Sequence, residues 1–176
     1  MINLISPEYA ELNRQLHEDR ADYGADAARN AKQIAQVARA NKVRTILDYG
    51  CGKGALKGAL AELAPELEVL EYDPAIPGKT TLPATPVDMV AALDVMEHIE
   101  PEHLEAVLAS MRAASRWGVL LLITTVPATK NLPDGRNAHL ILEPKDWWES
   151  RLGVYFKTAL VQEGPTGFVY IGLCKP

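Results

Sequence analysis

A length of 176 residues, with 48% hydrophobic and 23% charged residues, is typical of one globular domain and excludes collagenous, low-complexity and disordered chains. The 18 lysines and arginines and 23 aspartates and glutamates give a net charge of −5, so the chain as a whole would repel a phosphate backbone. We therefore expect no nucleic-acid partner, although a local basic groove is compatible with this balance.

The regular pattern begins with a helix predicted over residues 26–40, where apolar residues recur at helical spacing. Residues 1–25 precede it and are expected to form an N-terminal lid. His17 and Tyr23 lie in this segment, and Tyr23 is the candidate for a contact with a ligand. The remaining residues, 26–176, are expected to form one domain.

The next pattern is a strand, a glycine-rich turn, a helix and a second strand. The strands are predicted over residues 43–47 and 67–72. Asp73 directly follows the second strand, about 20 residues beyond the glycines. The inward face of the helix is expected to carry Leu56, Leu60 and Leu63.

The strand and helix alternation then continues. Residues 87–93 form a third predicted strand, followed by a helix that Pro101 opens. Residues 118–124 are the most apolar strand, as expected for a strand covered on both faces of a parallel sheet. The inward residues of the helix are expected to be Leu104, Val107, Leu108 and Met111.

A long loop over residues 125–142 leads to a short helix that Pro144 opens. Residues 155–162 and 167–173 then form a predicted antiparallel hairpin. Repeated strand–helix units that end in a hairpin predict a three-layer α/β/α sandwich with a mostly parallel sheet.

The glycine-rich turn is the strongest candidate for a ligand site, because glycines let the backbone approach a ligand closely. In an open α/β sheet, ligands bind beyond the carboxyl ends of the strands, where this turn, Asp73 and Asp94 all fall. Gly50, Gly52 and Ala55 fit the loose dinucleotide pattern. The carboxylate of Asp48 would oppose a pyrophosphate, however, and suits an amino group or a sulfonium cation. The P-loop spacing is absent around Lys53.

Residues 46–54, Ile-Leu-Asp-Tyr-Gly-Cys-Gly-Lys-Gly, resemble the motif of the class I S-adenosylmethionine-dependent methyltransferases. Asp73 and the string Asp94-Val95-Met96-Glu97-His98 strengthen the resemblance, which covers the chain from about residue 26 to its end. The chain is similar to small members of this family from bacteria and their viruses. The resemblance implies a Rossmann-like fold and S-adenosylmethionine as cofactor.

The resemblance also implies roles for single residues. The glycines would pass beneath the methionine part of the cofactor, and Asp48 would reach its amino group. Asp73 would accept hydrogen bonds from the ribose hydroxyls, since a carboxylate offers two acceptor oxygens; Glu71, on the same face, is the alternative. The cofactor-binding residues implied are Asp48, Tyr49, Gly50, Cys51, Gly52, Gly54, Asp73 and Asp94.

One departure from the family lies between Asp73 and Asp94, which are only about 20 residues apart. The family usually has another helix, a third strand and an acidic residue that contacts adenine in this interval. We predict that the sheet is trimmed beyond its second strand. No adenine carboxylate is assigned.

The candidate catalytic residues are Glu97, His98 and His139, because a base is needed when the methyl acceptor carries a proton. His139 lies in a loop long enough to be functional. The alternatives are that His98 packs under the following helix and that His139 is a surface or packed histidine. With Asp94, these residues are also similar to the divalent metal site of small-RNA 3′-terminal 2′-O-methyltransferases. Asp94 replaces an expected glutamate, and we do not expect a metal.

The expected function is methyl transfer from S-adenosylmethionine to an oxygen or nitrogen of a small molecule. One alternative is an RNA or modified-nucleotide methyltransferase, which would need that metal site or a basic groove around Lys130, Arg136 and Lys145. The other is a cofactor-binding subunit without catalysis.

The remaining features concern the compartment. Cys51 and Cys174 are too few for a disulfide framework or a paired-cysteine zinc site. The longest apolar stretch, residues 118–126, is shorter than the roughly 20 residues of a membrane span, and no signal-peptide pattern is present. We expect a cytoplasmic protein without a membrane partner, and its oligomeric state stays open.

Overall fold

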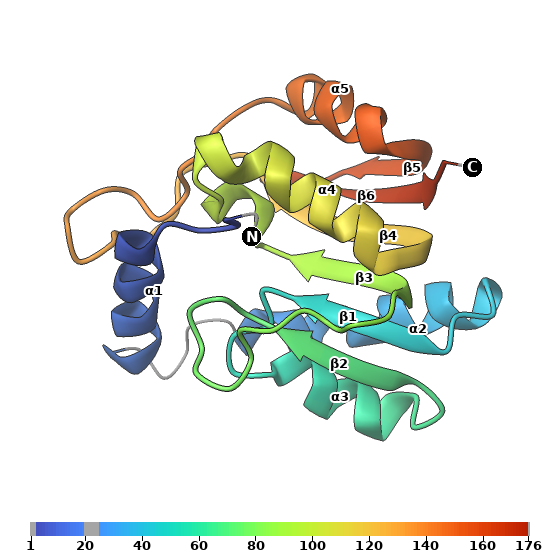
Figure 1. Cartoon of the computed structure of the whole chain (residues 1–176). Coiled ribbons are helices and arrows are strands. Elements are labelled where there is room, and N and C mark those ends of the chain that lie inside the picture. The colour runs from blue at the N-terminus through green and yellow to red at the C-terminus, as the bar shows by residue number, and fades with distance from the viewer. Residues whose placement is uncertain (1–2, 20–24, 176) are drawn as a thin grey trace.

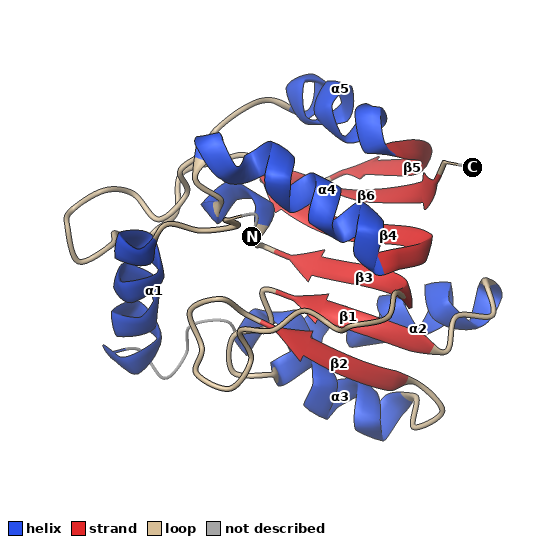
Figure 2. Cartoon of the chain, in the orientation of Figure 1, coloured by secondary structure: helices blue, strands red, loops and turns tan. Residues whose placement is uncertain are grey.

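The computed structural model describes residues 3–19 and 25–175, which form a six-stranded sheet with helices on both faces (Figures 1 and 2). The strand order is β2-β1-β3-β4-β6-β5. The first four strands in this order are parallel, and the β5–β6 hairpin is antiparallel. The strands are β1 (Thr45–Tyr49), β2 (Glu68–Tyr72), β3 (Val87–Leu93), β4 (Ser115–Thr124), β5 (Phe156–Glu163) and β6 (Gly167–Cys174).

Two apolar cores lie on the two faces of this sheet. Helices α4 (Leu104–Ala114) and α5 (Lys145–Tyr155) pack on one face, and α2 (Ala31–Ala40) and α3 (Ala55–Leu63) pack on the other. Because strand side chains alternate between faces, Leu121 joins the first core and its neighbour Leu120 the second. The predicted α/β/α sandwich, with its mostly parallel sheet and terminal hairpin, is confirmed.

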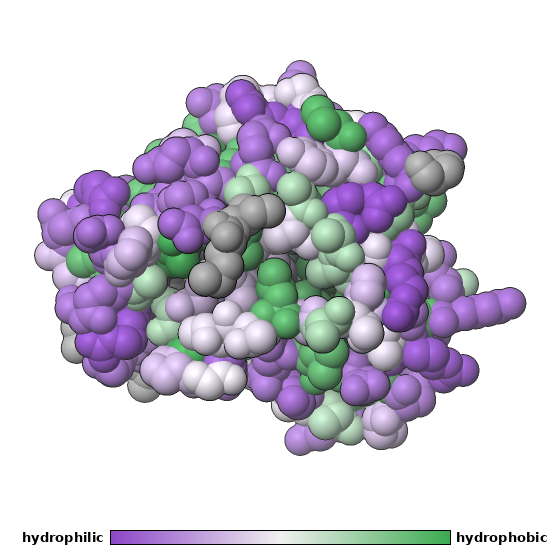
Figure 3. All heavy atoms as spheres, viewed as in Figure 1, coloured by the Kyte–Doolittle hydropathy of each residue, from purple (hydrophilic) through white to green (hydrophobic). Residues whose placement is uncertain are grey.

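The predicted trimming of the sheet is also confirmed. Strand β2 pairs only with β1 and forms the edge of the sheet, and residues 73–86 cross to β3 without forming another strand. In Figure 1 this crossing segment runs in front of β1 and β2, where no helix covers the sheet. Figure 3 shows apolar side chains in the centre of the same face, surrounded by hydrophilic ones.

Three local expectations differ from the structure. Leu63 was expected on the inward face of its helix, but it is 51% exposed because the chain leaves α3 there. Strand β1 begins and ends two residues later than predicted. It therefore ends at Tyr49 and includes Asp48. The helix predicted over residues 26–40 begins as a 3-10 helix, η1 (Ala25–Asn30), and becomes α-helical only in α2.

The N-terminal segment contains a helix that the sequence pattern had not predicted, α1 (Pro7–Asp19). It lies across the carboxyl ends of the parallel strands (Figure 1). Its apolar side packs against the long loop after β4 in a small separate cluster that includes Tyr9, Leu16, Leu132 and Ala138. Among the described residues, no helix is long and apolar enough to cross a bilayer.

Candidate active site

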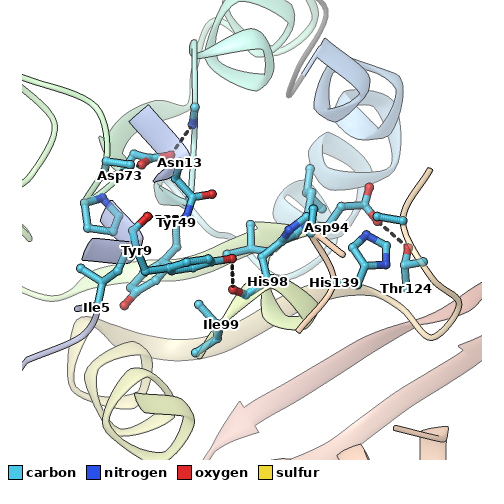
Figure 4. Close-up of a pocket in the computed structure, with 18 of the residues that line it drawn as sticks. Ile5, Tyr9, Asn13, Tyr49, Asp73, Asp94, His98, Ile99, Thr124 and His139 are labelled. Carbon is cyan, nitrogen blue, oxygen red and sulfur yellow. Dashed lines mark hydrogen bonds between the residues drawn. The ribbon is translucent and has the colours of Figure 1, made fainter. Parts of the chain in front are cut away.

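A cavity of about 430 Å³ lies at the carboxyl ends of β1, β2 and β3, and this size suits a small-molecule site. The glycine turn and the ends of the strands form one side. Helix α1 and the loop after β4 close the other side. Figure 4 shows Asp73 and Asn13 at one end of this space, Asp94 and His139 at the other, and the ring of Tyr9 between them.

The glycine turn is held rigidly by its own backbone. Gly50 has φ +76°, and a Cβ atom on it would lie 2.6 Å from a methyl carbon of Val95, so no other residue fits there. Amides of this turn donate to protein acceptors: Gly50 and Cys51 to the Tyr72 carbonyl, Gly52 to Asp73, and Gly54 to the Cys51 carbonyl. A pyrophosphate would need these amides as hydrogen-bond donors. Because they already donate within the protein, the turn does not suit a dinucleotide.

Asp48 places a carboxylate under the cavity. The residue is 2% exposed, and its Oδ2 has no hydrogen-bond partner within residues 3–19 and 25–175. Burial, helped by the nearby Glu71 carboxylate, raises the pKa of Asp48 to about 7. A buried carboxylate with an unused oxygen is suited to a cationic ligand group, which would supply both the missing charge and the missing donor.

Asp73 also faces the cavity, and backbone amides fix its orientation. Its Oδ2 accepts from Gly52 N–H and its Oδ1 from Ala75 N–H, each at 2.9 Å. Each oxygen keeps a further lone pair for a ligand hydroxyl. Glu71 does not line the cavity and instead pairs with Lys79 Nζ at 2.9 Å. This geometry favours Asp73 over Glu71 as the ligand-binding acid.

Asp94 occupies an unusual backbone position at the other end of the cavity. Its φ of +53° lies in the left-handed region, which a non-glycine residue adopts at a cost, and such strain clusters at functional sites. Its Oδ1 accepts a 2.8 Å hydrogen bond from the hydroxyl of Thr124, at the end of β4. The carboxylate is thereby held at the cavity wall (Figure 4).

The imidazoles of His98 and His139 meet edge to face in the same region, with ring centroids 4.7 Å apart. Nδ1 of His139 lies 2.6 Å from the carbonyl oxygen of Val126. Because a carbonyl only accepts, the neutral imidazole carries its proton on Nδ1, and Nε2 keeps a lone pair. Burial, with the adjacent His139 as a second cause, lowers the pKa of His98 to about 4, so His98 is neutral at pH 7.

Glu97 has a different position from the two histidines. It is 0% exposed and does not line the cavity. Its Oε1 accepts from Thr124 N–H at 3.0 Å, and its carbonyl accepts from the amides of Leu140 and Ile141. Burial raises the pKa of Glu97 to about 8. Glu97 therefore joins the end of β4 to the returning loop that carries His139, and of the three candidate catalytic residues only the histidines reach the cavity.

These three residues are also the candidate metal ligands. One donor atom from each of Glu97, His98 and His139 lies within 4.8 Å of the other two. Two imidazoles and a carboxylate are a donor set that zinc and other transition ions accept, provided that Glu97 is ionised. Asp94, the fourth ligand suggested by the sequence, lies outside this group.

Of the cavity residues that helix α1 supplies, the sequence had singled out only His17, as part of the expected lid. Tyr9, Asn13 and His17 line the cavity from this helix. The spacing of Tyr9, Leu12 and Leu16 is helical and could have revealed the inward face. Tyr23, the expected ligand contact, lies outside the described residues.

Residues 16–155 match the family described as "Methyltransferase domain". This match covers most of the chain and agrees with the fold, so the protein belongs to the methyltransferase domain family. None of the curated protein sequences compared with the chain matches it.

Solved structures of methyltransferases share the fold. An O-methyltransferase family protein from Burkholderia thailandensis has a TM-score of 0.59 and 13% identity, over 84% of this chain and 57% of its own. The chain thus spans little more than half the length of that protein. A second structure is the 1,6-didemethyltoxoflavin-N1-methyltransferase of Burkholderia thailandensis, with bound 1,6-didemethyltoxoflavin and S-adenosylhomocysteine. It has a TM-score of 0.61 and 19% identity, over 98% of this chain and 92% of its own. DhpI with S-adenosylhomocysteine has a TM-score of 0.63 and 18% identity, over 97% of this chain and 98% of its own.

Proposed function

We propose that this protein transfers a methyl group from S-adenosylmethionine to an oxygen or nitrogen atom of a small molecule. The family match supports methyl transfer, and the two similar structures of comparable length contain S-adenosylhomocysteine. The residues present fit this cofactor, because Asp48 offers an unused buried oxygen to an ammonium group and Asp73 offers two acceptor oxygens to ribose hydroxyls.

The residues that bind the cofactor surround the part of the cavity that contains Asp48 and Asp73. Tyr49, Gly50, Cys51 and Gly52 form its floor beneath the methionine part, whereas Gly54, also implied by the resemblance, does not line the cavity and lies against Glu71 and Lys79. Asp94 closes the space toward the acceptor. Adenine is placed beside Pro74 and Ala75, which line the cavity next to Asp73, and no carboxylate is assigned to it.

Bound S-adenosylmethionine supplies an electrophilic methyl group on a sulfonium centre. The protein must then hold the acceptor in line with that methyl group and remove the acceptor's proton. Nε2 of His139 takes this proton, since Nδ1 is already committed to the Val126 carbonyl. His98 supports the ring of His139, and Glu97 positions the loop behind it.

The N-terminal segment acts as the lid of this site. Ser6, just before α1, donates from its amide and its hydroxyl to the two carboxylate oxygens of Glu100, at 2.8 and 2.6 Å. These bonds hold α1 over the cavity, where it excludes water from the reacting groups.

The proposal rests on one observation. The same cavity is lined by Asp48, whose Oδ2 has no hydrogen-bond partner among the described residues, and by His139, whose Nε2 keeps a lone pair. The nucleic-acid alternative has less support. Within its basic groove, Arg136 pairs with Asp134 at 2.7 Å and Lys145 with Glu163 at 3.0 Å, so both cations already have acidic partners in this chain.

Calorimetric titration with S-adenosylmethionine and S-adenosylhomocysteine, with and without magnesium or zinc, tests the proposal. We expect saturable binding by the wild type that does not depend on metal, and weaker binding by Asp73→Ala. Formation of S-adenosylhomocysteine with a panel of hydroxyl and amine acceptors then separates an enzyme from a cofactor-binding subunit. Absence of binding at millimolar ligand would contradict the proposal.

A further inference from the structure

We propose that His17, in the last turn of α1, binds the α-carboxylate of the cofactor's amino-acid part. This inference rests on the proposed function, because it concerns the same cofactor site. It assigns to the lid a direct contact with the cofactor, in addition to covering the cavity.

The carboxylate of the bound cofactor needs a hydrogen-bond donor or a cation in this site. The amino-acid part of the cofactor carries both an ammonium and a carboxylate group, and a carboxylate taken out of water needs hydrogen-bond donors or a cation. Asp48 suits the ammonium group but repels the carboxylate. The glycine turn does not supply the missing donors, because the amides of Gly50, Cys51, Gly52 and Gly54 are engaged within the protein.

His17 lies where such a donor is needed. Its ring lies against the glycine turn: a Cβ atom on Gly52 would be only 3.0 Å from Cε1 of His17. His17 lines the same cavity as Asp48 and Asp73. An imidazole therefore reaches the part of the turn over which the methionine part is placed.

The neighbouring cations are less suitable for binding this carboxylate. Nζ of Lys79 donates to the Gly52 carbonyl and to Glu71, and Nζ of Lys57 also pairs with Glu71. Lys53 is exposed and does not line the cavity. The other cavity-lining residues with imidazole or ammonium groups, among those described, are His98, His139 and Lys130, which belong to segments at the acceptor end.

The arrangement links closure of the lid to the cofactor. Tyr9 lies on α1 two turns before His17 and faces the acceptor end of the cavity (Figure 4). A carboxylate bound by His17 would hold the helix down, and the helix would then complete the wall against which the acceptor binds.

Three ligands separate the contacts of the amino-acid part. S-adenosylhomocysteine carries the amine and the carboxylate, its decarboxylated analogue carries only the amine, and 5′-methylthioadenosine carries neither. We expect His17→Ala to weaken the binding of S-adenosylhomocysteine about 10- to 100-fold, which is the range of a hydrogen bond to a charged group. The affinity for the other two ligands should change less than about twofold. Asp48→Asn should instead weaken both amine-bearing ligands.

Two further variants control the test. His17→Gln keeps a donor and should recover part of the affinity for S-adenosylhomocysteine. Lys57→Ala removes an exposed cation from helix α3 that does not line the cavity, and it should leave the ratio between the ligands unchanged. If His17→Ala weakens all three ligands equally, or none of them, the carboxylate contact is wrong. If the wild type binds none of them, the proposed function itself fails.

Discussion

The hydroxyl of Tyr9 in α1 donates a 2.7 Å hydrogen bond to the backbone carbonyl of His98, which follows β3. The bond lies within the cavity and joins helix α1 to the segment after β3 that carries His98 (Figure 4). The ring of Tyr9 is buried, and burial raises the pKa of its phenol to about 12. Tyr9 therefore acts as a donor and a wall rather than as a base.

Tyr9→Phe keeps the ring and removes only this hydrogen bond. We expect a loss of about 0.5–1.5 kcal/mol of stability, because the His98 carbonyl loses a partner at a part-buried position. The KM for the acceptor should rise more than the kcat falls, since the lid is loosened while the reacting groups are intact. Tyr155→Phe, which removes an exposed hydroxyl bonded to Glu105, is the control for the melting temperature.

Asp48 makes stability and cofactor binding depend on pH in opposite directions. Its pKa of about 7 in the folded protein lies above the unfolded value near 3.9, so folding favours the protonated acid. Stability contributed by this group is present below pH 4 and is lost as pH rises toward 7. Asp48→Asn should therefore be more stable than the wild type at pH 8, by at most about 4 kcal/mol, and the difference should vanish near pH 4.

Binding of an ammonium group needs the ionised form of Asp48, so affinity should rise as pH increases toward 7. The decarboxylated analogue of S-adenosylhomocysteine is the suitable ligand, because it lacks the carboxylate that His17 would bind. We expect its affinity to fall about tenfold per pH unit well below pH 7 in the wild type. A wild-type profile as flat as that of Asp48→Asn would show that Asp48 does not contact the amine.

Local patterns in the sequence were sufficient to predict the sheet. The strand over residues 87–93 has the predicted bounds, and the short interval between Asp73 and Asp94 correctly indicated a trimmed edge. These features depend on runs of apolar residues and on the number of residues between two motifs, and both can be read directly from the sequence. The outward position of Leu63 was missed because helical spacing does not show where the chain departs from the core.

The placement of helix α1 and the position of Glu97 depend on distant contacts, and local patterns carry little of that information. Tyr9 and His98 are 89 residues apart in the chain, and Ser6 and Glu100 are 94 apart. Glu97 and His98 are adjacent in one short turn, yet only His98 lines the cavity. Which of two neighbouring polar residues faces a ligand is decided by how the turn packs, and the motif alone does not determine it.

Glu97 provides a test that separates a structural clamp from a metal ligand. Glu97→Gln keeps the shape and the acceptor oxygen for Thr124, and because the acid is protonated at pH 7 we expect little change in stability or turnover. Glu97→Ala should cost about 2–4 kcal/mol through the lost bond and the cavity left behind. If Glu97→Gln abolished zinc- or magnesium-dependent turnover, the metal site would be supported instead. Thermal denaturation with and without each ion measures stability and ion binding, and a turnover assay with the same ions measures the dependence of activity on metal.

His139 is the residue on which the proposed chemistry depends most. His139→Ala should lower kcat about 10²- to 10⁴-fold, the usual contribution of a general base, while the affinity for S-adenosylhomocysteine stays within about twofold of the wild type. His139→Gln can keep a hydrogen bond to the acceptor but cannot take its proton, so it should be nearly as slow. An acceptor that is already ionised needs no base, and its turnover should fall far less in both variants. Equal losses for ionised and neutral acceptors would mean that His139 only shapes the pocket.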